Sequence, residues 1–170
     1  KKFNELYSVT LLKKVLEYAE KIKSFDAKLN TAQNEYESSK ELLEISKKQT
    51  EIKAELARAK KEMYDRQLDT LSDILTKQTE IKAKQAAVQK DLYEREIVSL
   101  SQYLTSRDTL LNAQKSEFNS KASTTKLELD YLSAKDAVLN AEKAQFNAKT
   151  SVIKLEASIT TQTADKQAFI

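Results

Sequence analysis

The sequence predicts an all-α protein whose main element is a long antiparallel coiled-coil helical hairpin. Its 170 residues include no Gly and no Pro, the residue types that tight turns with positive φ and most long loops use. Apolar residues recur at intervals of seven along most of the chain. A seven-residue repeat kept over many turns makes helices supercoil around a partner. Long helices are therefore the economical structure, and sheets joined by hairpin turns are disfavoured.

We expect residues 1–170 to form a single helical coiled-coil module, with residues 1–24 as an extra apolar helical segment. The apolar side chains of this segment recur at helical spacing. They cover a sector wide enough to face more than one neighbour. No run in the chain approaches the ~20 apolar residues of a membrane-spanning helix, so direct insertion of this segment into a membrane is not expected.

Residues 25–95 are predicted to form the first arm. A line of residues spaced by seven begins in the apolar segment and continues through this arm. Its companion line becomes small and polar after Ala32. The seam between the arms is therefore expected to be weaker than a leucine zipper and to include Leu43, Tyr64 and Leu71. The full line is Val15, Ile22, Leu29, Tyr36, Leu43, Thr50, Ala57, Tyr64 and Leu71.

The turn is predicted at residues 96–99, because two signals for the start of a helix coincide there. Ser99 and Gln102 have the spacing of a capping box, in which each side chain bonds the other residue's backbone N–H. Val98 and Tyr103 are placed as a hydrophobic staple. The same Ser-x-x-Gln spacing occurs at Ser46, so a second break near that residue is an alternative.

Residues 100–170 are predicted to form the second arm, with a central line of apolar residues spaced by seven. Leu132, Leu139 and Phe146 on this line are expected to lie in the seam. Flanking lines, one of them rich in Ala, make the stripe three positions wide and favour two packing faces. The central line is Leu104, Leu111, Phe118, Thr125, Leu132, Leu139, Phe146 and Ile153.

Internal repeats support growth of the coiled coil by duplication. The segment 48–54 returns at 77–83, a shift of 29, and the segment 111–119 returns at 139–147, a shift of 28. Four heptads make 28 residues. The aromatic residues fall in step with this period, except for a slip between Tyr93 and Phe118, across the predicted turn.

Two other architectures fit parts of the pattern. A three-helix bundle would have breaks near Ser46 and Ser99, and one continuous coiled coil would need a partner chain to cover its stripe. We prefer the hairpin because both halves carry matching apolar stripes and the phase slip falls at its tip.

The composition argues against an enzyme. Without Cys or His, the chain lacks the usual ligands of zinc and haem and the pairs that activate a nucleophile. No Gly-rich loop can hold a phosphate. We therefore expect no catalytic residues, no metal and no cofactor. The 29 basic and 26 acidic residues alternate along the chain, which is typical of a solvated surface and does not favour nucleic-acid binding.

The predicted tip resembles the hairpin tips of bacterial periplasmic adaptor proteins, also called membrane-fusion proteins. Leu92 and Ser99 occupy two places of that family's Arg-Leu-Ser tip pattern. Val88 stands where the family has Arg, and Glu94 and Glu96 stand where Gly is often found. The outer-membrane ducts of the same machines have similar Ala-rich helices, but they also need β-strands.

The resemblance implies a structural and docking role. The hairpin would belong to an adaptor that bridges an inner-membrane transporter and an outer-membrane duct in secretion or efflux. Neighbouring hairpins would pack side by side in a homo-oligomer, in the periplasm or another extracytoplasmic compartment, with the parent protein anchored through parts outside this segment. The expected partner-binding residues are Leu92, Arg95, Ile97, Val98, Ser99 and Tyr103.

Two functions of other classes remain as alternatives. The first is a structural coiled-coil rod of a surface or cytoskeletal protein, which needs only the heptads. The second is a helical pore-forming toxin, which should carry an apolar tongue. No such tongue is visible in the sequence.

Overall fold

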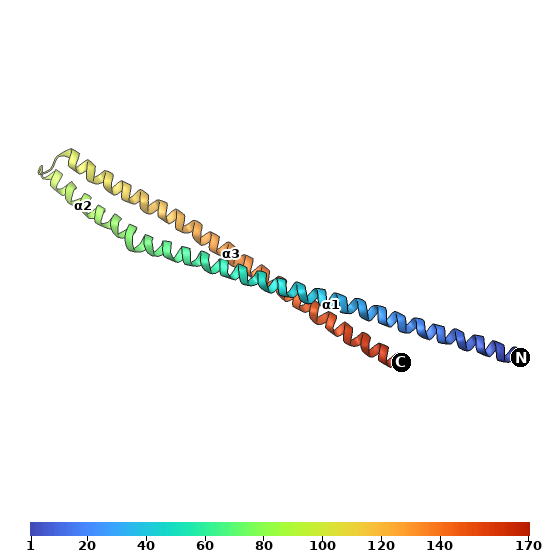
Figure 1. The fold of residues 1–170 in the computed structure, drawn as a ribbon. Helices are drawn as coiled ribbons and strands as arrows, with labels where there is room; N and C mark the ends of the chain where they lie inside the picture. Colours follow the sequence, from blue (N-terminus) through green and yellow to red (C-terminus); the bar gives the residue numbers. More distant parts are fainter. The chain divides into compact units, whose positions relative to one another are not determined.

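The protein is helical from end to end apart from one turn. A computed structural model describes residues 1–170, with the elements α1 (Lys2–Thr70), η1, a π-helix (Leu71–Leu75), α2 (Thr76–Glu94) and α3 (Leu100–Phe169). The first three elements form the outgoing arm, and α3 returns alongside α2 after the turn (Figure 1). The predicted all-α helical hairpin is confirmed.

The turn occupies residues 95–99, between the end of α2 and the start of α3. The segment predicted from the sequence, 96–99, lies inside it, and the outgoing arm ends at Glu94, one residue earlier than expected. No break occurs near Ser46, because α1 continues through that residue. The three-helix bundle and the continuous coiled coil are therefore both wrong.

Packing divides the hairpin into two compact units. Unit 1 combines Lys1–Thr50 with Asn140–Ile170, and unit 2 is the continuous stretch Glu51–Leu139, which includes the turn. In unit 1 the ring of Phe169 stacks on Tyr18, with the centroids 5.1 Å apart, and lies 5.4 Å from the ring of Phe25. The ammonium of Lys166 pairs with the carboxylate of Asp26. These contacts join the end of α3 to α1.

Residues 1–24 are not a separate helix, because α1 includes them from Lys2 onward. Their large apolar side chains are mostly exposed. Those with at least 42% of their surface exposed are Phe3, Leu6, Tyr7, Val9, Leu11, Leu12, Val15, Leu16 and Tyr18.

The seam on the outgoing arm follows the line predicted from the sequence. Leu71 and Ala57 are buried on it, and Leu43 and Tyr64 are half-buried. Two helices alone enclose few large side chains. Leu71 is the one large residue among the buried positions, and the others are Ala, Ser and Thr. The contact between the two arms therefore comes from the close approach of their helices, and not from a wide core of large side chains as in a bundle.

The seam on the returning arm differs from the prediction. Leu132, Leu139 and Phe146 are 49%, 57% and 68% exposed, so they do not lie in it. Residues of the flanking lines take their place, and Ala134 and Ala141 are buried. The prediction gave the seam to the largest residues, whereas small residues let two helix backbones approach. The large residues form a second, outward face.

The π-helix η1 accommodates one extra residue in the outgoing arm. Seam residues are seven apart up to Leu71. The next seam residue is Thr79, which is eight positions after Leu71. From Thr79 to Ala86 the spacing is seven again. Thr70 and Thr76, on either side of η1, keep right-handed helical φ and ψ. A π-turn holds one more residue than an α-turn, so it returns the seam to the same side. The 29-residue shift of the segment 48–54 has the same cause: four heptads plus this residue.

Candidate functional site at the hairpin tip

The end of α2 is closed by a Schellman motif. The Ile97 N–H donates to the Leu92 carbonyl and the Glu96 N–H donates to the Tyr93 carbonyl, both at 2.9 Å. Glu96 has φ 59°, the only positive φ in the chain. This left-handed position favours Gly, and a residue with a Cβ costs about 1–2 kcal/mol there. The two backbone bonds hold Glu96 in this conformation.

The start of α3 is closed by the predicted capping box. The Gln102 N–H donates to the Ser99 hydroxyl at 3.2 Å, and the Ser99 N–H donates to Oε1 of Gln102 at 3.0 Å. Such a cap contributes about 1 kcal/mol. With both helix ends capped, the five residues between them are fixed by local hydrogen bonds.

Two tyrosines join the arms next to the turn. The ring of Tyr93 stacks on the ring of Tyr103, with the centroids 5.5 Å apart and 5° between the planes. The guanidinium of Arg107 lies 6.0 Å from the centroid of the Tyr103 ring, within reach of a cation–π interaction. Tyr93 is not among the predicted site residues. The sequence marks it only as a member of the aromatic series that follows the repeat.

The six predicted site residues lie at one end of unit 2 but differ in what they present to a partner. Ile97 is 66% exposed, whereas Leu92 and Val98 are half-buried. Arg95 is exposed, and its Nε lies 3.4 Å from Oδ2 of Asp91. The Ser99 side chain caps α3, and the half-buried Tyr103 takes part in the tyrosine stack.

Leu100, which the predicted set left out, is 50% exposed. Its position as the first residue of α3 follows from the capping box. Together with Ile97, it gives the tip its exposed apolar surface, so these two residues are the site's strongest contact candidates.

Two ionisable side chains away from the tip have shifted pKa values. A hydrogen bond from Thr79, and then one from Lys121, lower the pKa of Glu117 below 4.5. A hydrogen bond to Glu37 raises the pKa of Lys40 above 10.5. The Glu117 contact crosses between α2 and α3, because Thr79 lies on the other arm.

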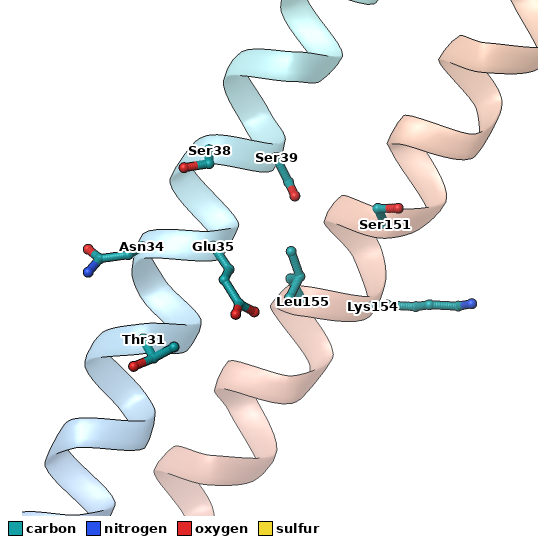
Figure 2. A pocket seen from close by; sticks show the side chains of 8 residues that line it. All are labelled: Thr31, Asn34, Glu35, Ser38, Ser39, Ser151, Lys154 and Leu155. Atoms are coloured by element: carbon teal, nitrogen blue, oxygen red, sulfur yellow. The ribbon is translucent and has the colours of Figure 1, made fainter.

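A groove of about 690 Å³ opens between α1 and α3 in unit 1. Figure 2 shows Ser39 and Leu155 directed into the space between the helices, while Asn34 and Lys154 point away from it. Ser39 occupies a seam position where a larger residue would fill this space. The groove is therefore a gap in the seam, open to water.

No group of three or more His, Cys, Asp or Glu side chains is arranged to hold a metal ion. None of the helices combines the length and apolar character that a membrane-spanning helix requires. Comparisons with models of known families, with curated proteins and with solved structures found no match to this chain.

Proposed function

We propose that this chain is the docking hairpin of a transport adaptor in an extracytoplasmic compartment. It would act as a spacer between an inner-membrane transporter and an outer-membrane duct, with the tip as the contact for the duct. The observation that carries this proposal is the exposed apolar pair Ile97 and Leu100 on a turn capped at both ends.

A capped turn is suited to recognition because its backbone is ordered before the partner arrives. Ordering a loop on binding costs about 0.5–1.5 kcal/mol for each flexible side chain, and a preformed loop avoids part of that cost. The tyrosine stack supports the same geometry from the helix side of the turn. The tip therefore presents its apolar residues in one arrangement.

The surroundings of the pair resemble the organisation of a small interface. The exposed charges of Asp91, Arg95 and Glu96 lie next to the apolar residues. Interfaces commonly have an apolar centre and a polar rim. The hairpin's own fold needs neither Ile97 nor Leu100 to be apolar, since both are at least half exposed.

The test places a charge on the tip of the full-length parent protein and measures cargo export and duct binding. Ile97→Asp introduces a charge at the exposed apolar position. Ser99→Asp introduces one at the cap, and Ser99→Asn is its matched control, because Asp and Asn both cap helices well but only Asp is charged. We expect both Asp variants to lose export and duct binding while Ser99→Asn keeps them.

Circular dichroism must show unchanged helix content in all three variants for this comparison to stand. If both Asp variants are folded and export normally, the tip proposal is wrong. A structural coiled-coil rod, which has no need of a specific tip, would then account for the seam.

A further inference from the structure

The π-helix η1 is the only interruption of α-helical hydrogen bonding within either arm. The backbone N–H of Thr76 donates to the Leu71 carbonyl, five residues back. The Thr76 hydroxyl donates to the same carbonyl at 3.0 Å. A π-turn inside an α-helix is a recurrent place for a kink, because its wider turn interrupts the regular ladder of hydrogen bonds.

The returning arm has a bending feature of its own at the same level. The Thr79 hydroxyl reaches the Ala113 carbonyl across the seam, and the arms are antiparallel, so η1 lies level with residues 117–121 of α3. Here the Thr124 hydroxyl donates to the Ser120 carbonyl at 2.8 Å. A hydroxyl that bonds back to the carbonyl four residues earlier competes with the backbone ladder and often bends a helix. Other threonines of the chain make this bond, but Thr124 is the one buried residue that does so.

The seam between these two features is polar. Ser120 and Thr124 are the only buried polar residues of the chain. The side-chain amide of Gln67 donates to the Ser120 hydroxyl at 3.0 Å, and Glu117, one turn from Ser120, is half-buried. Leu71 is the single large apolar side chain that is buried at this level.

Apolar packing lies on both sides of this polar layer within unit 2. Away from the turn, Ala57 and Ala134 are buried in the seam. Toward the turn, Ala86 is buried and the rings of Tyr93 and Tyr103 stack. Polar groups that separate can bond to water instead, so their net contribution is small, whereas apolar surfaces that separate lose their burial outright. The seam therefore yields most easily at the polar layer.

We infer that unit 2 contains a hinge at the level of η1, about which the outer segment, residues 76–116, bends as one body. Leu71 is the pivot, because a single apolar contact can persist while the helices on either side of it change direction. Water replaces the hydrogen bonds of the polar layer when the hinge bends. The hinge does not depend on what the tip contacts, so it is separate from the docking role proposed above.

A bend at η1 changes where the tip lies. The helix α2 has 19 residues, so it spans about 28 Å between η1 and the turn. A kink of ~20° at η1 would therefore displace the tip by about 10 Å. The capped turn stays intact in this motion, because its hydrogen bonds lie wholly within the outer segment. The hinge thus lets a rigid tip approach a partner from more than one direction.

Pulsed electron paramagnetic resonance tests this with two spin labels on the outgoing arm. The chain has no Cys, so Arg58→Cys with Lys84→Cys places one label on each side of η1 at exposed positions, about 39 Å apart. Lys23→Cys with Gln49→Cys is the matched pair, with the same separation in sequence, inside unit 1 and without a π-turn. We expect the distance distribution across η1 to be roughly twofold wider than that of the matched pair. An excess of unlabelled chain keeps each measured distance within one molecule.

Two variants remove the features that form the hinge. Deleting Asp73 lets η1 become a regular α-turn, and Gln67→Leu with Thr124→Val makes the seam at this level apolar. We expect each of them to narrow the distance distribution across η1 toward that of the matched pair. Gln78→Leu with Thr105→Val makes the same replacements at exposed positions of unit 2, so this control should keep the wide distribution.

Hydrogen exchange provides an independent measurement. Backbone amides of residues 72–79 should exchange roughly tenfold faster than those of residues 55–62, and deletion of Asp73 should remove the difference. A distance distribution across η1 as narrow as that of the matched pair would overturn the hinge. An unchanged width in both hinge variants would overturn it as well, because the bending would then arise elsewhere.

Discussion

Tyr93 at the end of α2 stacks on Tyr103 at the start of α3, with 5° between the ring planes. The two rings join the arms directly beside the capped turn. The contact links residues that are close in sequence, so it closes only a short loop and costs little chain entropy. It is a local contact between the two arms.

A double-mutant cycle on Tyr93→Leu and Tyr103→Leu measures this contact. We expect a coupling free energy of about 0.5–1.5 kcal/mol, as for other aromatic pairs, in urea unfolding followed by circular dichroism. Tyr64→Leu paired with Tyr103→Leu is the control, because Tyr64 lies on the same seam line in another part of unit 2. Coupling of equal size in the control pair would contradict a direct interaction between the rings.

The left-handed backbone at Glu96 predicts that Glu96→Gly stabilises the hairpin. Gly removes the Cβ clash at φ 59° but gains freedom in the unfolded chain, so the net gain should be about 0.5–1 kcal/mol. Arg95→Gly is the comparison, because Arg95 has φ −86° and Gly offers no relief there. Urea unfolding should show a higher midpoint for the first variant and a lower one for the second. If the urea midpoint fell for both variants, the left-handed conformation at residue 96 would not be populated.

The turn and the seam on the outgoing arm could be predicted from the sequence because both depend on local residue patterns. The capping box requires only Ser99 and Gln102, and the line ending at Leu71 has a strict period of seven up to that residue. The positive φ of Glu96 was not foreseen, since nothing local marks a glutamate for it. The resemblance to adaptor tips had placed Gly there, and this was an overlooked signal.

The returning seam was misplaced because periodicity does not say which face meets the partner. Three adjacent lines share the same period on α3, and size alone favoured the line through Leu139. Packing against the other arm selected the lines through Ala134 and Val138 instead. Which lines pair is decided by how closely two backbones approach, and this is a property of both helices together.

Leu71→Ala and Leu139→Ala should therefore differ strongly in effect. Leu71 is buried, so its truncation should cost about 2–3 kcal/mol of unfolding free energy. Leu139 is 57% exposed, so its truncation in a monomer should change stability by less than about 0.5 kcal/mol. Thermal unfolding at low protein concentration, where association is absent, checks both. If both truncations lowered the free energy of unfolding equally, Leu139 would lie in the seam, as the sequence predicted for the returning arm.

The contact between Thr79 and Glu117 predicts a pH dependence of stability. The hydrogen bond and the nearby Lys121 lower the pKa of Glu117 in the folded state, so its ionised form stabilises the fold. This contribution is fully present above the unfolded-state pKa, near 4.5, and is lost as the pH falls through the lower folded-state value. Glu117→Gln should therefore lower the melting temperature at neutral pH, and the difference from the unmodified chain should shrink in acid. Glu128→Gln, on the exposed surface of the same arm, is the control and should leave the melting temperature at neutral pH nearly unchanged.

The π-helix predicts that one residue can be removed from the outgoing arm without loss of pairing. Deleting the exposed Asp73 would bring Thr79 into step with Leu71 at seven residues and let η1 become a regular α-turn. We expect an unchanged or higher melting temperature for this deletion. Inserting one Ala after Asp73 would place two extra residues between the same seam positions, more than one π-turn accommodates, and should lower the melting temperature by several degrees, equivalent to about 1–2 kcal/mol. If the deletion is the more damaging of the two changes, then η1 does not compensate for an extra residue, and the 29-residue shift needs another cause.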